Sequence, residues 1–389
     1  MPSGDRCRSL RAGDARLGNA SRLAPAICID ATAASPRQRA RIDLRVISFT
    51  VVLFALALTP LLGWDYDGHR IINKLALASL PADFPKFVRE PAAAERIAFL
   101  SGEPDRWRNA PDLPLRHVNN PDHYFDFEQL GWAGLDPASA SPLRYEFALQ
   151  FAAGRAAHPG NFRPIDPGRN ADRTREWPGF LPWEITEDFE RLRSVFSCLR
   201  AFQEAGGTAS EIANEQANAI DLMGVMGHYV GDGAQPLHDT VQHNGWVVGD
   251  NPHGFTTDPK FHAWIDGGFI ARARITFDRL ASQARPARSL RTDFNPGERD
   301  AMFTEVMRYL EAQNRRVEPL YQLEKSGMLR ADDSPGSEKG REFIDEQLLR
   351  GGEMLGSLWL TAWRTAPPDR FLLQQLARRT ITGRTTGGP

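Results

Sequence analysis

Histidine and aspartate recur one helical turn apart at two places in the sequence. His228 and Asp232 are four residues apart, and His262 and Asp266 repeat this spacing. In an α-helix such residues leave the same face, one turn apart. Residues 220–227 are apolar or small with a single exception, so we expect the first pair to be buried. A divalent cation would satisfy a buried carboxylate and a buried imidazole together.

A hydrogen-bonded His–Asp pair in the protein core is the alternative, and for one isolated pair it would be the simpler interpretation. The second pair weakens it, as does His238, which we expect to turn back across the helix end after Pro236. Two His-x-x-x-Asp pairs and a further histidine form a ligand set suited to more than one metal ion. Because imidazole dominates the set, Zn²⁺ is expected rather than Mg²⁺.

Two further segments carry candidate ligands. His123 precedes Tyr124 and lies three residues before Asp126. Asp105 lies in Glu-Pro-Asp-Arg-Trp-Arg, where a turn positioned by proline presents a carboxylate next to Arg108. A surface salt bridge is the alternative explanation for Asp105, and spacing alone favours it.

The N-terminal segment resembles a secretory leader. Four arginines between residues 37 and 45 precede an uncharged run at 47–63, which is the order of a signal peptide. A permanent transmembrane anchor is the alternative, but the run is shorter than the ~20 residues that a spanning helix requires. We therefore expect a signal peptide at 46–63 and a secreted or periplasmic protein. Residues 1–45 would be a disordered leader or the result of a start codon assigned too far upstream.

Cleavage after Gly63 would make Trp64 the first residue of the mature chain. A free α-amine has a pKa near 8 and can bind metal near neutral pH. The amine and carbonyl oxygen of Trp64 could then chelate one ion together with His69, which lies about one helical turn further on.

Charge limits how the protein could hold a polyanion. The whole chain has a net charge of −2, and its first 63 residues hold nine Arg and four Asp, which leaves −7 for the rest. Such a chain cannot bind nucleic acid through a polycationic face alone. Bound metal would have to supply the positive charge.

The elements that must position these residues are helical. Apolar residues recur at helical spacing over 71–80, 143–157, 184–205, 212–230, 302–310 and 343–363. No convincing alternating strand is found, so the prediction is an all-α fold with a single domain at 64–370. Long irregular stretches at 158–183 and 239–259 interrupt the helices, and we expect the tail at 371–389 to be disordered.

The chain resembles the superfamily of zinc-dependent phospholipases C and single-strand-specific nucleases of the S-one/P-one type. Its run from His228 to His238, His-Tyr-Val-Gly-Asp-Gly-Ala-Gln-Pro-Leu-His, is similar to the core signature of that superfamily. The resemblance extends from Trp64 to about Ala366 and implies a multihelical domain with long loops around a trinuclear zinc site. The other matching positions are Trp64, His69, Asp105, Arg108, His123, Tyr124 and Asp126.

The resemblance also implies how three zinc ions would be held. One would lie between Asp105, His123, His228 and Asp232; a second would take the main chain of Trp64, His69 and a bridging Asp232; the third would use His238, His262 and Asp266. Asp105 would orient the attacking water or act as a base, and Arg108 would neutralise charge that develops on the phosphate.

Three functions remain open from the sequence. The first is a nuclease acting on single-stranded nucleic acid, with 3′-nucleotidase as a further activity open to it, in which Tyr124 would stack on a base and Asp126 would accept hydrogen bonds from a base edge. The second is a phospholipase C that releases a phosphorylated headgroup into a groove lined by apolar side chains. The third is a non-catalytic zinc-stabilised binding protein, which would need neither Asp105 nor Arg108. An aspartate at position 266 is similar to the nucleases, since the phospholipases tend to have glutamate there. For Tyr124, ordinary packing is the alternative to a substrate contact. We expect a monomer with no stable protein partner and no membrane anchor.

Overall fold

The structure is a computed structural model that describes residues 64–293, 299–332 and 336–385. The expected leader and signal peptide, residues 1–63, lie outside this part of the chain. All regular elements within the described residues are helical, with no strand among them, which confirms the all-α prediction. None of the described helices is both long and apolar enough to span a bilayer.

Long helices form the framework, and short ones carry much of the remaining chain. The α-helices are α2 (Tyr66–Ser79), α3 (Pro91–Leu100), α4 (Glu103–Arg108), α5 (Leu113–Asn119), α6 (Phe127–Trp132), α7 (Arg144–Ala157), α8 (Leu181–Ala205), α9 (Ala209–Asp232), α10 (Phe261–Ala263), α11 (Phe269–Ala273), α12 (Phe277–Leu280), α13 (Ala301–Asn314), α14 (Val317–Lys325), α15 (Ser337–Thr365) and α16 (Arg370–Thr385). Short 3-10 segments include η1 (Lys86–Arg89), η2 (Asn120–His123) and η5 (Pro236–His238), and η6 (Trp264–Gly268) is a π-helix.

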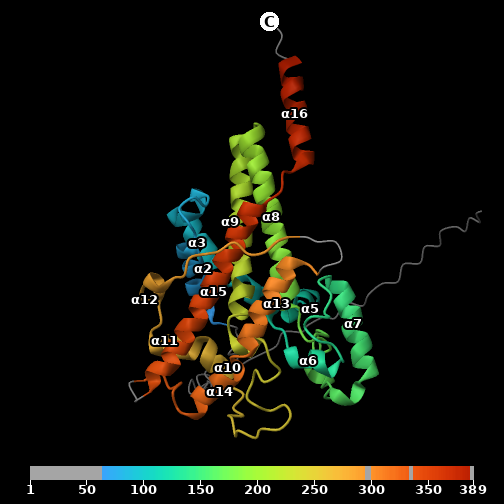
Figure 1. Cartoon of the computed structure of the whole chain (residues 1–389), viewed down its shortest axis with the longest axis vertical. Helices are drawn as coiled ribbons and strands as arrows, with labels where there is room; N and C mark the ends of the chain where they lie inside the picture. Colours follow the sequence, from blue (N-terminus) through green and yellow to red (C-terminus); the bar gives the residue numbers. More distant parts are fainter. Residues whose placement is uncertain (1–63, 294–298, 333–335, 386–389) are drawn as a thin grey trace, which may run out of the picture. The chain divides into compact units, whose positions relative to one another are not determined.

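Helices α8, α9 and α15 pack side by side, and α2 lies along α15 (Figure 1). The turn between α8 and α9 is well specified by its residues. Gly206 ends α8 with a φ of 86°, in the left-handed region that glycine adopts without strain. Thr208 and Glu211 then form a reciprocal capping box at the start of α9. Local chemistry therefore fixes where the helix that carries His228 begins.

Helices α2 and α9 approach each other closely because α9 carries glycine where they meet. A Cβ added at Gly227 would overlap the Asn73 amide, and one added at Gly231 would lie 2.6 Å from Nδ1 of His69. The Asn73 amide donates to the main-chain oxygens of Ile97 (2.8 Å) and Gly224 (3.1 Å). These contacts tie α2, α3 and α9 together at the level of the site.

The six helices expected from apolar spacing correspond to α2, α7, α8, α9, α13 and α15, with ends that differ by a few residues. Residues 239–259 form no helix, and residues 158–180 contain only two short 3-10 turns, as expected. Much of the additional helix consists of short elements such as α4, α5 and α6. Each is too short for an apolar repeat to be recognised.

The C-terminal segment differs from the expectation of a disordered tail at 371–389. The structure has helix α16 over Arg370–Thr385, which begins where Asp369 accepts a hydrogen bond from the Leu372 amide at 2.9 Å. Leu376 is buried, and Arg379 forms an ion pair with Glu211 of α9. The Arg- and Thr-rich composition of this segment concealed these tertiary contacts.

Candidate metal centre

Eight of the predicted ligands converge from seven different elements. They are His69 of α2, Asp105 of α4, His123 of η2, His228 and Asp232 of α9, His238 of η5, His262 of α10 and Asp266 of η6. All are buried except His262, which is half-buried. Residues far apart in the sequence thus form one continuous cluster of imidazoles and carboxylates.

Asp232 lies at the centre of this cluster. One carboxylate oxygen is 3.4 Å from Nε2 of His69 and 3.6 Å from Nδ1 of His238, and the other is 3.3 Å from Nε2 of His228. The i,i+4 pairing of His228 with Asp232 is therefore as the sequence predicts. A single carboxylate whose two oxygens face Nε2 of His69 and Nε2 of His228 is placed to bridge more than one cation.

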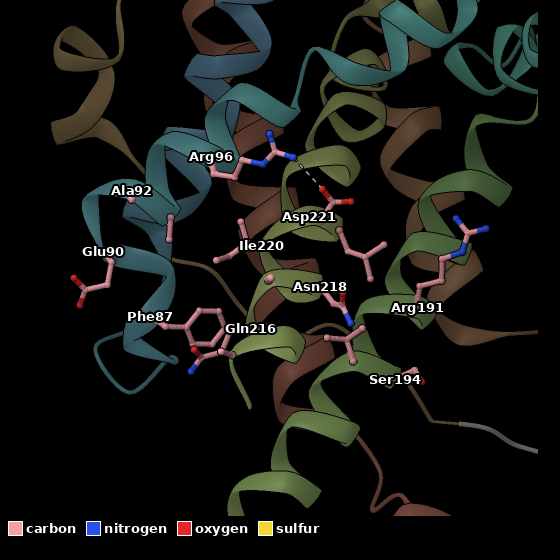
Figure 2. Close-up of a pocket in the computed structure, with 15 residues that line it drawn as sticks. Phe87, Glu90, Ala92, Arg96, Arg191, Ser194, Gln216, Asn218, Ile220 and Asp221 are labelled. Carbon is pink, nitrogen blue, oxygen red and sulfur yellow. Dashed lines mark ion pairs between the residues drawn. The ribbon is translucent and has the colours of Figure 1, made fainter. Parts of the chain in front are cut away.

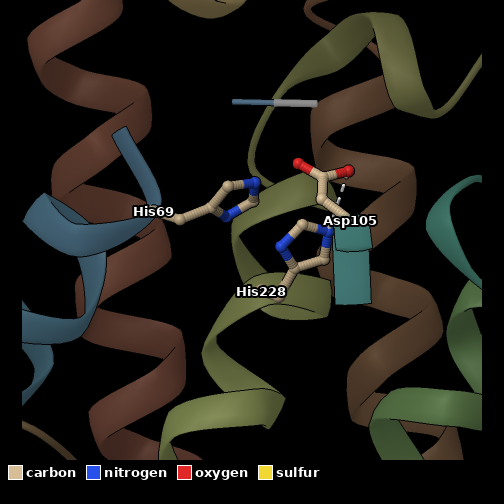
Figure 3. A group of neighbouring side chains, drawn as sticks. All are labelled: His69, Asp105 and His228. Atoms are coloured by element: carbon tan, nitrogen blue, oxygen red, sulfur yellow. Dashed lines mark ion pairs between the residues drawn. The ribbon is translucent and has the colours of Figure 1, made fainter. Parts of the chain in front are cut away.

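Asp105 closes the cluster on the side of α4. Figure 3 shows the His69 and His228 rings facing each other with the Asp105 carboxylate beside them; the ring centroids are 4.0 Å apart. Oδ1 of Asp105 lies 3.9 Å from Nε2 of His228 and 4.0 Å from Nε2 of His123. The same oxygen is 3.1 Å from Nε of Arg108, so Asp105 is part of the buried cluster as well as of an ion pair.

The second His–Asp pair forms a neighbouring group. Nε2 of His262 is 3.0 Å from a carboxylate oxygen of Asp266 and 3.0 Å from Nε2 of His238. The pair lies where the α10 turn passes into the π-helix η6, which still keeps the two side chains together. Gln235 donates its side-chain N–H to the other oxygen of Asp266 at 2.6 Å.

Main-chain carbonyls orient three of the histidines. Nδ1 of His228 lies 2.7 Å from the Ser101 oxygen, and Nδ1 of His238 lies 2.6 Å from the His123 oxygen. Nδ1 of His123 makes the same contact with the Asn119 oxygen at 2.7 Å. Because a carbonyl oxygen only accepts, Nδ1 must carry the proton in each ring. The neutral ring then has its lone pair at Nε2, the arrangement that metal-binding histidines use.

Several polar atoms of the cluster are buried without a hydrogen-bond partner among the described residues. They are both carboxylate oxygens of Asp232, Nε2 of His123 and His228, and both ring nitrogens of His69. Such atoms cost on the order of 1–3 kcal/mol each when left unsatisfied. Zinc with Zn–N distances of about 2.0 Å places tetrahedral ligands about 3.3 Å apart, close to the separations around Asp232. The donor set therefore fits a metal site.

Burial and neighbouring charge set the protonation of these groups. Burial lowers the pKa of His69 and of His262 to about 4, so both rings are neutral near pH 7. Burial acts in the same direction on His228, but the carboxylates of Asp232 and Asp105 outweigh it and raise its pKa. Burial would raise the pKa of Asp232, yet the rings of His238 and His228 hold it well below its usual range. The central carboxylate stays ionised.

Three groups within the cluster can hold a metal ion. Two share His228: one adds His69 and Asp105, and the other adds His123 and Asp232. The third consists of His238, His262 and Asp266, which is the set implied for the third ion. The first two groups divide the remaining ligands differently from the sets that the resemblance implies.

Trp64 lies beside the cluster, and its role as a chelating N-terminus stays a prediction. Its side chain is fully buried, and the next residue, Asp65, donates its N–H to the main-chain oxygen of Asp266 at 3.0 Å. The segment that begins at Trp64 is thus held against a candidate ligand.

A cavity of about 560 Å³ opens beside the third group. His238 and His262 line it together with Arg108, Tyr124 and Asp126. The structure therefore brings the predicted catalytic arginine and both predicted substrate-binding residues to one space next to the histidines. Burial raises the pKa of Asp126 to about 8, so this carboxyl holds its proton near neutral pH.

Among the polar residues near the cluster, Gln235 and Asp239 have no role assigned from the sequence, and for His243 the sequence predicts a solvent-facing or substrate-lining role and leaves metal contact open. Gln235 orients Asp266; the carboxylate of Asp239 is fully buried, and burial raises its pKa well above the usual range. His243 lines the cavity, with its ring centroid 6.2 Å from that of His262. The available signal was position, since Gln235 and Asp239 flank the Pro-Leu-His238 segment.

A larger hollow of about 1040 Å³ lies elsewhere, between η1, α3, α8 and α9 (Figure 2). Phe87, Ala92, Ile220 and Leu222 give it an apolar lining, and Arg96 pairs with Asp221 at its edge. None of the predicted site residues lines this hollow, so size alone does not identify the functional site.

A scan against protein-family models and a search of the curated proteins each found no match for this chain.

Proposed function

We propose that the protein is a zinc-dependent hydrolase of phosphate diesters whose substrate is single-stranded nucleic acid. The observation that carries the proposal is the buried cluster around Asp232, in which several ligand atoms lack hydrogen-bond partners among the described residues. The cluster adjoins a cavity that Arg108 also lines. A purely structural zinc site would be closed, whereas a catalytic one needs access for substrate.

Each residue has a role that follows from its position. Zinc ions bound in such a cluster would supply Lewis acidity toward phosphate oxygens and would lower the pKa of a water nucleophile. Asp105 lies within 4.0 Å of two imidazoles and can orient that water or accept its proton. Arg108, 3.1 Å from Asp105 and at the cavity wall, can donate to a phosphate oxygen as negative charge develops.

Residues next to the histidines supply contacts for a base. Tyr124 is half-buried at the cavity wall and can stack on a planar ring. Asp126, protonated near neutral pH because its pKa is about 8, can donate a hydrogen bond to a ring nitrogen or carbonyl. Both roles suit a nucleotide better than an acyl chain.

A phospholipase C is the competing enzyme, and the lining of the cavity argues against it. That function requires apolar groove walls, and Phe162, Ile165 and Trp177 supply part of them. Trp132 also lines the cavity, but six arginines line it as well. A phosphate-rich chain fits this lining better than a lipid.

The test is a set of parallel assays on the chain that begins at Trp64. Single-stranded DNA, RNA and phosphatidylcholine vesicles are offered with and without a chelator. We expect hydrolysis of both nucleic acids and its loss on chelation. Turnover of lipid alone would favour the phospholipase C over the nuclease. Activity that survives zinc removal would overturn the mechanism.

A further inference from the structure

The lining of the cavity beside the histidines is rich in arginine. Arg155, Arg163, Arg169 and Arg175 all line it, and all lie within or next to the irregular stretch at 158–183. We refer to these four residues as the arginine wall. Arg163, Arg169 and Arg175 are exposed, and Arg155 is half-buried. An irregular segment of this length is a common location for binding residues.

Main-chain oxygens, more than carboxylates, hold these side chains in place. Arg163 donates to the Val247 oxygen at 2.6 Å, Arg175 to the Arg169 oxygen at 2.6 Å, and Arg155 to the Glu176 oxygen at 3.2 Å. A main-chain oxygen orients a guanidinium without neutralising it. Three of the four positive charges of the arginine wall are thereby fixed around one space.

The carboxylates of the same cavity do not cancel this charge. Asp172 is paired with Arg116, which is outside the arginine wall, at 3.3 Å. Asp126 is protonated near neutral pH. Asp166 lies 3.7 Å from Arg169, but both side chains are largely exposed, and such a pair is worth little. The wall retains a net positive charge and can accept an anion.

Aromatic side chains accompany the arginines in this cavity. Tyr124 lines it together with Arg175 and with His238 and His262. Arg155 lies 4.4 Å above the ring of Phe162, which packs edge-on against Trp132 at 5.8 Å between ring centroids. Aromatic rings interleaved with arginines are typical of surfaces that bind successive nucleotides.

We propose that the arginine wall is a second phosphate-binding subsite, which holds a phosphate next to the one that is cleaved. The inference rests on the phosphodiesterase function proposed above and extends it. The preferred substrate would carry two or more phosphate groups, of which one reaches the histidine cluster while another is bound by Arg163, Arg169 and Arg175. The second phosphate could belong to a polynucleotide strand or to a polyphosphorylated lipid headgroup.

The first test compares substrates that differ in their number of phosphates. In the double variant Arg163→Gln/Arg169→Gln we expect kcat/KM for a short single-stranded oligothymidylate to fall about tenfold or more, mainly through KM. Hydrolysis of bis(p-nitrophenyl) phosphate, which has one phosphate, should stay within about twofold of wild type. The control Arg272→Gln/Arg370→Gln removes the same charge from exposed positions outside the cavity and should leave both rates unchanged.

The second test measures binding without turnover. Labelled oligothymidylate is titrated into the chelator-treated full chain at several salt concentrations, and log K is plotted against log salt. The slope should flatten by about 0.7 for each phosphate interaction that the double variant removes, and should stay the same in the control. Because Arg163 bridges two loops, Arg169→Gln alone, which removes only an exposed ion pair, is measured as well.

Vesicles that contain phosphatidylinositol bisphosphate form the other arm of the binding test. Weaker binding of either ligand by the wall variants supports the subsite and identifies the source of its phosphate. Unchanged binding, salt slope and KM for both ligands would overturn the inference, even if the enzyme hydrolyses diesters. If the wild type hydrolyses no diester while wall variants still bind oligothymidylate less tightly, the proposed function fails and the subsite stands.

Discussion

Asp232 is the residue on which most of the site depends. Its two oxygens contact three imidazoles at 3.3–3.6 Å from α2, α9 and η5. Bulk solvent does not reach it, because its exposure is 0%. A buried carboxylate in this setting is costly unless a cation compensates it. Replacement of Asp232 should therefore reduce metal affinity more strongly than it reduces the stability of the fold.

Asp232→Asn keeps the shape of the side chain and removes its charge. We expect zinc affinity and phosphodiesterase activity to fall more than about hundredfold, since loss of even an outer partner of a metal ligand costs about ten- to hundredfold. A chelator should lower the Tm of the wild type and have little effect on the Tm of the variant. Asp221→Asn, an exposed position on the same helix with an ion pair to Arg96, is the matched control. Equal Tm shifts in the two variants would contradict a metal role for Asp232.

Gln235 is a positioning residue, because it acts through Asp266. It donates to the Asp266 carboxylate at 2.6 Å and accepts the N–H of Leu237 at 2.7 Å. Gln235→Ala should weaken zinc binding about tenfold to hundredfold, as measured by competition with a coloured chelator. Gln283→Ala, at an exposed position, should bind zinc like the wild type. A stability loss in Gln235→Ala with unchanged zinc affinity would show a structural role only.

The sequence was informative about the residues that could bind metal directly. It was silent about the residues that hold those ligands in place. Two His-x-x-x-Asp pairs could be recognised because helical spacing determines which side chains are neighbours. Gln235 and Asp239 were not, because their importance comes from tertiary partners that no local pattern encodes. Asp105 was ambiguous for the same reason: its spacing fits a surface ion pair, and only its burial beside His123 and His228 distinguishes the two interpretations.

At the scale of elements, the close contact of α2 with α9 positions His69. Gly231 faces that ring, and a Cβ there would lie 2.6 Å from its Nδ1. Gly231→Ala should therefore displace His69 and reduce zinc binding, and overpacking should cost roughly 1–3 kcal/mol of unfolding free energy. Urea denaturation and zinc titration measure the two effects.

Gly131 of α6 is the matched control for that substitution. A Cβ added at Gly131 meets nothing within 4 Å, so Gly131→Ala should stabilise the protein by up to about 1 kcal/mol through helix propensity. Zinc binding should be unchanged in it. If Gly231→Ala binds zinc as the wild type does, the close approach of α2 and α9 is not what positions His69.

Element prediction succeeded where helices are long and amphipathic. Helices α8, α9 and α15 carry apolar residues over many turns, so their spacing is a strong signal. Helices α4, α5 and α6 have six or seven residues each, and packing rather than local sequence stabilises them. The unexpected α16 belongs with them, since it is held by Leu376 and the Arg379–Glu211 ion pair.

At the scale of the whole molecule, removal of residues 1–63 is the prediction on which an N-terminal metal ligand depends. In a chain that begins at Trp64, the Trp64 amine is free, and the next residue, Asp65, donates its N–H to the Asp266 oxygen. In a chain that begins at Gly63, the nitrogen of Trp64 is part of a peptide bond. We expect the first chain to bind more zinc than the second, as counted by atomic emission. The same zinc content in both would contradict an N-terminal chelate and leave the histidine cluster unaffected.

Positive charge is unevenly distributed over the molecule. The chain after residue 63 has a net charge of −7, which disfavours long-range attraction of a polyanion. The positive groups that a phosphate would contact are instead concentrated at one cavity, where bound zinc would add to them. Overall composition could not reveal this, because it averages the arginine wall with the acidic remainder.

Zinc content and activity measured on the same samples test the central proposal most directly. The chain that begins at Trp64 is chelated stepwise, and bound zinc and hydrolysis of single-stranded DNA are recorded at each step. We predict about three zinc ions per chain at the start, the number that the resemblance implies, activity that falls with zinc, and recovery when Zn²⁺ is added back. Full activity in samples that hold no zinc would contradict the proposal.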